Sequence, residues 1–219
     1  MIRGNSPASG KPASDVPCIY VVDDDQSVRE ALSSLFRSVG YHVQLFGSTA
    51  DFMKVQPINI HCCLVLDVRL PGVSGLELQN HLNREQIRVP IIFMTGHGDI
   101  PMSVRAMKAG AIDFLSKPFR DQDMLDAVAQ ALDADRKHRD AEQSASGVRA
   151  AFETLSARER EVMQLVTSGL MNKQVAGKLD LSEITVKIHR GHVMKKMGAQ
   201  SLADLVRMAE LLSLGSAKS

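Results

Sequence analysis

The chain has 219 residues, enough for one large or two small domains, and 44% of them are hydrophobic. No apolar run is long enough to cross a bilayer, so we expect a soluble globular protein and no membrane partner. The net charge of +1 hides an asymmetry, because residues 1–135 carry 12 Lys and Arg against 16 Asp and Glu, whereas residues 136–219 carry 14 against 9. The acidic and basic halves indicate two tasks, with the basic half a candidate for nucleic-acid binding.

Residues 1–15 are rich in Ser, Pro, Gly and Ala and lack the apolar centre of a signal peptide, so we expect a disordered tail. The three cysteines are Cys18, Cys62 and Cys63. Their odd number, and the adjacent pair within an apolar run, favour reduced thiols in the cytoplasm over disulfides. Adjacent cysteines on a strand point to opposite faces, which disfavours a shared metal.

Apolar runs alternate with amphipathic segments from residue 16 to residue 135. Strands are predicted at 18–22, 42–46, 62–66, 90–94 and 111–116, and helices at 27–40, 49–55, 74–85, 100–110 and 121–135. This alternation predicts an α/β domain with a doubly wound five-stranded parallel sheet.

Residues 136–153 are polar, and we interpret them as a partly helical linker in which "SASG" (144–147) breaks the helix. Helices are predicted at 157–169, 172–179, 183–198 and 201–214, so residues 154–219 form an all-α domain. Ser156 and Glu159 match a capping box, and Asn172 and Ser182 are expected to cap the next two helices. A short helix, a tight turn and a basic helix form a helix-turn-helix unit.

Polar residues lie at the carboxyl ends of four of the predicted strands. Ligands bind outside the carboxyl ends of parallel strands, so we expect Asp67 to meet Lys117 and a cation held with the acids of the first strand. Carboxylates without His or Cys favour Mg²⁺. A carboxylate beside Mg²⁺ can attack phosphorus and form an aspartyl phosphate. The residues at these strand ends are Asp23, Asp24, Asp25, Asp67, Thr95 and Lys117.

Each of these residues also has an ordinary interpretation. Asp25 is expected to cap the helix that follows it. Thr95 alone would be a turn residue, and Lys117 alone a solvated lysine. Their joint placement around one crevice favours a functional site, in which Lys117 neutralises a phosphoryl group and Thr95 hydrogen-bonds one of its oxygens.

The motifs "VVDDD", "VLDVRLPGVSG", "MTGHGD" and "KPF" resemble those of a CheY-like response-regulator receiver, which has a flavodoxin-like fold. The run from Thr95 to Phe119 resembles the FixJ subgroup. The resemblance implies that Asp67 is the phosphoacceptor and that Mg²⁺ is held by Asp23, Asp24, Asp67 and the backbone carbonyl of Arg69. It also implies a cis bond between Lys117 and Pro118, and a switch pair of Thr95 and Phe114. Core packing is the alternative for Phe114, and Cys62, Cys63 and His97 are interpreted as structural.

The predicted helix 183–198 has an unusual outer face. At 100° per residue, Val186, His189, Val193 and Met197 point inward, while Ile184, Lys187, Ile188, Gly191 and Lys195 point outward. Apolar and Lys side chains suit a major groove, where they reach thymine methyls and guanine edges. Gly191 costs about 1 kcal/mol relative to Ala, which a close approach to DNA would explain. The candidates for phosphate contacts are Lys173, Arg190, Lys195 and Lys196.

The alternative for these basic residues is a solvated charged face. His189 and His192 are interpreted as a core residue and a rim residue rather than metal ligands.

Residues 154–212 resemble the LuxR/NarL output domain through "LSARERE", "NKQVA" and "TVKIHRGHVMKKM", although some relatives have a basic base-reading residue in place of Gly191. Together the resemblances imply a transcriptional regulator that a histidine kinase phosphorylates. They also imply dimerisation through residues 100–114, binding to a two-fold promoter DNA site, contact with RNA polymerase and transcriptional activation.

Two alternatives stay open. One is a Mg²⁺-dependent hydrolase that uses an aspartyl-phosphate intermediate. Such an enzyme needs a second acid near the nucleophile to activate water, and Val68, Arg69 and Leu70, which follow Asp67, supply none. The other is a constitutive DNA-binding protein with the receiver as a scaffold.

Overall fold

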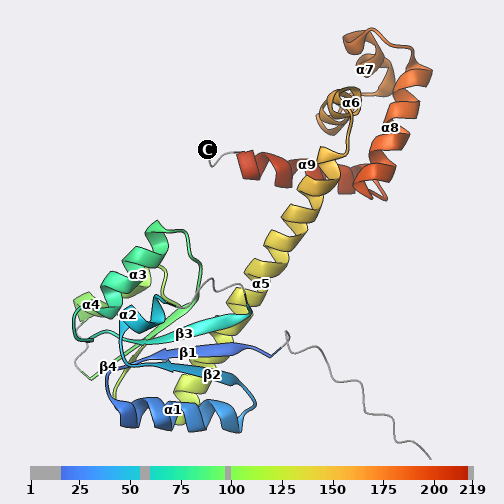
Figure 1. The fold of residues 1–219 in the computed structure, drawn as a ribbon. Helices are drawn as coiled ribbons and strands as arrows, with labels where there is room; N and C mark the ends of the chain where they lie inside the picture. Colours follow the sequence, from blue (N-terminus) through green and yellow to red (C-terminus); the bar gives the residue numbers. More distant parts are fainter. Residues whose placement is uncertain (1–15, 55–59, 97–99, 217–219) are drawn as a thin grey trace, which may run out of the picture. The chain divides into compact units, whose positions relative to one another are not determined.

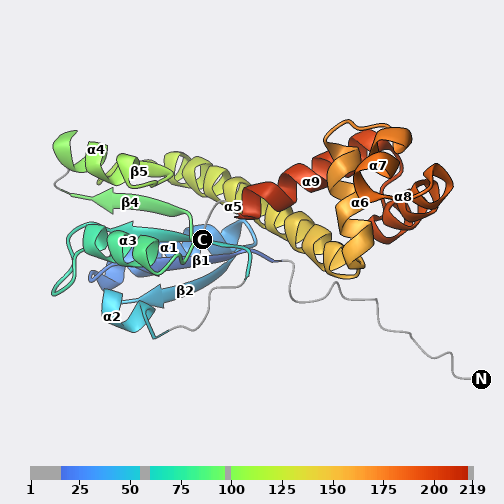
Figure 2. The same cartoon turned by 90° about the horizontal axis from the view of Figure 1, so that it is seen from above.

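The computed structural model describes residues 16–54, 60–96 and 100–216, and it divides into two compact units, Met1–His138 and Arg139–Ser219 (Figures 1 and 2). The predicted tail at residues 1–15 and the interpretation of His97 as structural lie outside the described residues.

The described strands of the first unit form one parallel sheet, as the alternating sequence predicts, and their order in it is β2-β1-β3-β4-β5. Figure 1 shows helices on both sides of this sheet. The strands are β1 (Cys18–Val22), β2 (His42–Phe46), β3 (Cys62–Asp67), β4 (Ile91–Thr95) and β5 (Asp113–Ser116), and the helices are α1 (Gln26–Ser38), α2 (Thr49–Phe52), α3 (Gly75–Arg84), α4 (Ile100–Lys108) and α5 (Asp121–Glu153).

The sheet separates two hydrophobic layers. Side chains of α1 and α5, such as Phe36 and Met124, pack on one face. Side chains of α2, α3 and α4, such as Phe52 and Leu78, pack on the other. Residues of β1, β3 and β4 are buried throughout, which explains their unbroken apolar runs, whereas the edge strand β2 is partly exposed.

Polar contacts fix the helices to the strand ends. Asp25 caps α1 by accepting a hydrogen bond of 2.8 Å from the Ser27 amide, which confirms its predicted role as a cap. On α5, the buried Asp135 carboxylate accepts a hydrogen bond of 3.1 Å from the Cys62 amide. That bond satisfies the first amide of β3, so the acid is buried with a partner.

The predicted break at "SASG" is wrong, because residues 136–153 are helical throughout as part of α5. Gly147 costs only about 1 kcal/mol inside a helix. The residues that follow it offset this cost, since Val148, Ala151 and Phe152 pack against the core of the second unit. Tertiary packing therefore outweighs the local preference.

The second unit contains α6 (Ala157–Thr167), α7 (Asn172–Leu179), α8 (Glu183–Met197) and α9 (Leu202–Ser216). The capping box of Ser156 and Glu159 and the Ser182 cap are present as predicted. The predicted Asn172 cap is wrong, because the N-cap of α7 is Met171, whose amide donates to Gln174 at 2.9 Å. No helix within the described ranges has the length and apolar character needed to cross a membrane.

Candidate functional site

The carboxylates predicted at the strand ends lie together. Asp23 follows β1 and is fully buried, Asp67 ends β3 and is buried, and Asp24 is exposed. Each offers a carboxylate oxygen within 4.8 Å of the others. Three oxygen donors at this spacing match the ligand set that Mg²⁺ prefers, so the residues present fit this ion.

Lys117 joins the two buried acids, and its contact with Asp67 is the one that the sequence predicts. Its Nζ lies 2.6 Å from Asp23 Oδ2 and 2.7 Å from Asp67 Oδ2. Its backbone amide donates a hydrogen bond of 2.8 Å to the carbonyl of Thr95, and its bond to Pro118 is cis, as the resemblance implies. The ammonium is therefore held between the ends of β1 and β3.

The charges of this cluster are tightly linked. Burial raises the pKa of the Asp23 carboxyl, although the hydrogen bond from Lys117 opposes that effect. At Lys117, burial disfavours the ammonium, but the hydrogen bonds to Asp23 and Asp67 outweigh it and raise the pKa. One ammonium beside three carboxylates leaves excess negative charge, which a divalent cation would neutralise.

Two residues that sequence reasoning missed shape the site. A Cβ at Gly75 would lie 2.3 Å from the carbonyl oxygen of Asp67, so only glycine fits there. Arg29 Nη1 donates a hydrogen bond of 2.6 Å to the carbonyl of Asp23. Gly75 is the last residue of the motif "VLDVRLPGVSG", so the sequence contained a signal for it. The Arg29 contact depends on the folded structure, and no sequence pattern indicates it.

The predicted switch residues lie on neighbouring strands. Thr95 is buried at the end of β4. Phe114 of β5 is half-buried and packs against the sheet, with its ring centroid 6.4 Å from that of Phe93. This packing is compatible with both interpretations of Phe114, and its switching role stays a prediction.

The outer face of α8 has the pattern expected for a DNA-reading helix. Val186, Val193 and Met197 are buried, whereas Ile184 is 74% exposed and Ile188 is 53% exposed. Lys187, Gly191 and Lys195 are also exposed. A Cβ at Gly191 would meet nothing within 4 Å, so the described internal packing does not require this glycine.

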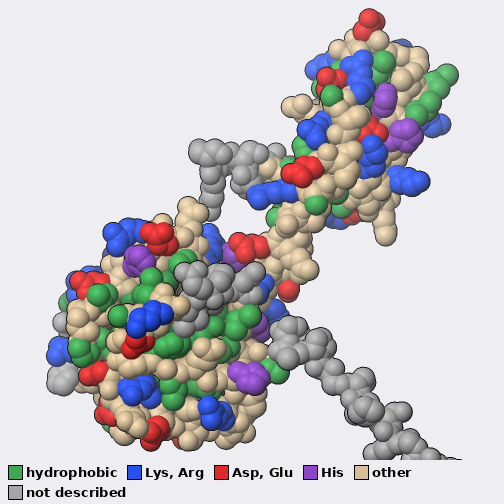
Figure 3. All heavy atoms as spheres, in the orientation of Figure 1, with side chains coloured by type: hydrophobic (Ala, Val, Ile, Leu, Met, Phe, Trp, Pro, Cys, Tyr) green, Lys and Arg blue, Asp and Glu red, His purple; other side chains and the backbone are tan. Residues whose placement is uncertain are grey.

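The basic candidates differ in their surroundings. Lys173 and Lys195 are exposed, whereas Arg190 Nη1 donates to Asn172 Oδ1 at 3.1 Å. Lys196 Nζ lies 2.7 Å from Glu159 Oε2, so a phosphate contact would require it to leave this ion pair. Figure 3 shows Lys and Arg side chains on the visible face of the second unit, with hydrophobic and His side chains between them.

Comparisons with known families match both units. Residues 19–129 match the model of the response regulator receiver domain, and residues 153–209 match that of the bacterial regulatory proteins of the luxR family. The chain is a LuxR-type response regulator. It therefore contains a phosphoreceiver domain followed by a helix-turn-helix DNA-binding domain, which confirms the predicted family and fold.

Several known proteins resemble this chain over most of its length. Nodulation protein W of Bradyrhizobium diazoefficiens is 59% identical over 93% of this chain and 90% of its own. Transcriptional regulatory protein FixJ of Rhizobium meliloti is 42% identical over 87% of this chain and 94% of its own. The solved structure of response regulator StyR has a TM-score of 0.80 and 49% identity, and it covers 89% of this chain and 98% of that chain.

Glu159 stabilises the DNA-binding domain of this response regulator. Its buried carboxylate accepts hydrogen bonds from Lys196 and from the Ser156 amide, and these contacts lower its pKa to about 2 from the ordinary 4.5. A carboxyl whose pKa falls on folding stabilises the fold above its unfolded pKa. That contribution is therefore lost as the pH falls from about 4.5 toward 2.

We expect Glu159→Gln to destabilise the DNA-binding domain by about 1–2 kcal/mol at neutral pH, because it removes the charge that pairs with Lys196, while Gln can still accept the hydrogen bond from the Ser156 amide. Denaturant unfolding of the full chain between pH 7 and pH 2.5 measures this loss. The difference in free energy of unfolding between the variant and the unmodified chain should shrink as the pH falls. The control is Glu161→Gln, whose side chain is 50% exposed and pairs with Arg158, and which should cost under about 0.5 kcal/mol. Equal effects of the two substitutions would contradict the role of Glu159.

Proposed function

We propose that a sensor histidine kinase phosphorylates this response regulator on Asp67, and that phosphorylation raises its affinity for promoter DNA. The observation that carries the proposal is the Lys117 ammonium, which bridges Asp23 and Asp67 beside a third carboxylate. This arrangement supplies a nucleophile and the charges that stabilise a transferring phosphoryl group.

Asp67 would act as the nucleophile. One carboxylate oxygen forms a bond to phosphorus as the bond between phosphorus and the donor's leaving group breaks, which gives an aspartyl phosphate. Asp23, Asp24, Asp67 and the backbone carbonyl of Arg69 would hold Mg²⁺, which neutralises phosphoryl charge when it is bound. Lys117 would stabilise the same charge from the other side.

Thr95 and Phe114 would carry the signal away from the site. We propose that the Thr95 side chain turns to hydrogen-bond the phosphoryl group. The Phe114 ring would then rotate into the space that Thr95 leaves. The face formed by α4 and β5 would then pair with a second copy. Exposed apolar side chains on α4 support this, because Ile100 is 80% exposed and Val104 and Met107 are each 44% exposed.

A dimer would place two DNA-binding domains on a two-fold DNA site. On each, Ile184, Lys187 and Ile188 of α8 would face the major groove, where Gly191 allows a close approach. Lys173, Arg190, Lys195 and Lys196 would contact phosphates. We assign residues 16–135 to the receiver, 136–153 to a helical connector and 154–219 to the DNA-binding domain.

Relatives named transcriptional regulatory protein FixJ support a role in transcription. We propose that the protein acts in the cytoplasm and activates transcription through RNA polymerase. A Mg²⁺-dependent phosphate hydrolase is less well supported, since the residues after Asp67 supply no acid. Sustained turnover of p-nitrophenyl phosphate with Mg²⁺ would revive that function.

Fluorescence anisotropy with a duplex selected from a random pool tests the proposed function. We expect the full chain to bind the duplex more tightly after treatment with Mg²⁺ and acetyl phosphate. Equal affinity before and after a verified phosphorylation would instead support a constitutive DNA-binding protein.

Two substitutions on α8 separate base reading from phosphate binding. Lys187→Ala should cost about 1–3 kcal/mol on the selected duplex and relax its sequence preference. Lys195→Ala should weaken binding to all duplexes alike and reduce the slope of log affinity against log salt by about 1. Identical behaviour of the two variants would contradict the assignment of Lys187 to the bases.

A further inference from the structure

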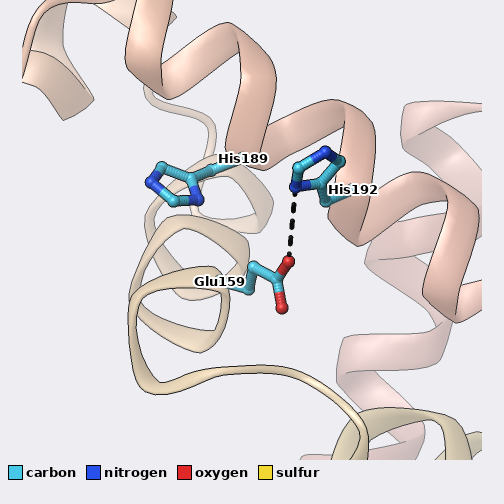
Figure 4. Close-up of side chains that lie close together, drawn as sticks. All are labelled: Glu159, His189 and His192. Atoms are coloured by element: carbon cyan, nitrogen blue, oxygen red, sulfur yellow. Dashed lines mark ion pairs between the residues drawn. The ribbon is translucent and has the colours of Figure 1, made fainter.

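A second cluster of potential metal ligands lies in the DNA-binding domain. Glu159 of α6 and His189 and His192 of α8 each offer one ligand atom, and these atoms lie within 4.8 Å of one another. Figure 4 shows the His192 ring of α8 directed at the Glu159 carboxylate of α6, with the His189 ring nearby on the same helix. His189 and His192 are three residues apart, a spacing that puts both rings on the same side of a helix.

His189 has an unusual nitrogen. Its Nδ1 atom is buried and has no hydrogen-bond partner within the described structure. Leaving a buried polar atom without a partner carries a free-energy cost, and such atoms are rare in folded proteins. An ion or a water molecule bound at this nitrogen would remove the cost.

The contact between His192 and Glu159 also leaves room for an ion. His192 Nδ1 lies 3.6 Å from Glu159 Oε1, which is too long for a hydrogen bond. Two atoms that each lie about 2.0–2.2 Å from a tetrahedral metal are separated by roughly 3.4 Å. The other oxygen, Oε2, already accepts from Lys196 and the Ser156 amide, so Oε1 is the oxygen directed to the histidine.

We propose that Glu159, His189 and His192 form a binding site for a divalent transition metal ion, with Zn²⁺ as the best match to two imidazoles and one carboxylate. The donor set distinguishes this site from the all-oxygen cluster around Asp67, which suits a harder ion. The ion would join α8 to α6 and so fix the helix that carries Ile184, Lys187 and Ile188. The proposal does not depend on phosphorylation.

Lys196 sets the expected strength of binding. Its ammonium lies 2.7 Å from Glu159 Oε2 and would repel the incoming cation. We therefore expect moderate affinity that rises when this charge is removed. Lys196→Met should bind the ion more tightly than the unmodified chain.

The test is a titration of the chelator-treated full chain with Co²⁺ and with Zn²⁺, in excess Mg²⁺ to occupy the Asp67 cluster. We expect one equivalent of Co²⁺ to give the visible absorption of a four-coordinate site and Zn²⁺ to displace it. His192→Asn should weaken binding at least about ten-fold. The His192 side chain is 58% exposed, so this variant should fold, which circular dichroism would verify.

The matched control is His81→Asn, which removes a half-buried histidine of α3 from the receiver. It should bind Co²⁺ as the unmodified chain does. Equal affinity of His192→Asn and the unmodified chain would overturn the proposal, as would equal losses in His192→Asn and His81→Asn. Unchanged or weaker binding by a folded Lys196→Met variant would contradict the assignment of Glu159 as a ligand.

Discussion

Asp67→Asn is expected to abolish the phosphodonor-dependent rise in DNA affinity while the basal affinity stays. An amide is a far weaker nucleophile than a carboxylate, so no phosphoryl group can be accepted at this position. The residues of α8 that we propose contact DNA lie in the other compact unit and are unchanged by the substitution. Anisotropy titrations with and without acetyl phosphate would measure the loss.

The matched control for Asp67→Asn is Asp25→Asn. Both substitutions replace a carboxylate with an amide. Asp25 also follows β1, but its side chain caps α1 by accepting a hydrogen bond from the Ser27 amide. Asn is an equally good N-cap, so the control should fold normally and keep its response to the phosphodonor. A full response from Asp67→Asn, or its loss in Asp25→Asn alone, would contradict the proposed acceptor.

Lys117→Met is expected to slow phosphorylation of Asp67 by about 100-fold or more. It removes the ammonium that bonds Asp23 and Asp67, and the loss of one charged donor at a reacting centre typically has an effect of this size. Rates from intact mass spectrometry at saturating Mg²⁺ would measure the change.

The same substitution should make stability depend more strongly on Mg²⁺. Asp23 is fully buried, and without Lys117 its carboxylate has lost its cationic partner. The melting temperature of Lys117→Met should therefore rise more on adding Mg²⁺ than that of the unmodified chain. Lys54→Met is the control, because Lys54 forms an exposed pair with Asp51, and it should alter neither the rate nor the Mg²⁺ response. A Lys117→Met variant that phosphorylates at the normal rate would contradict the role of Lys117.

Sequence patterns were sufficient for the sheet and for the acid–lysine contact. Unbroken apolar runs mark strands buried on both faces, and parallel strands bring their carboxyl ends to one edge. The contact between Asp67 and Lys117 follows from that rule alone, although the residues are 50 positions apart in the chain. The close approach of Gly75 to the Asp67 carbonyl depends on the path of the loop between them, which no periodicity specifies.

Local rules failed where packing between distant elements decided the outcome. Gly147 did not end α5, because Val148 and Phe152 gain a hydrophobic core in the helical conformation. Asn172 is not a cap, and its side chain instead accepts a hydrogen bond from Arg190 of α8. The approach of Glu159 to His192 likewise requires α6 to pack against α8.

The most direct test of the central claim is to incubate the full chain with Mg²⁺ and acetyl phosphate and to record intact mass and sedimentation in the same sample. The account predicts the gain of one phosphoryl group, located at Asp67 by peptide mapping, together with conversion of monomer to dimer. A chain that gains no phosphoryl group, or gains it at a residue other than Asp67, would contradict the account.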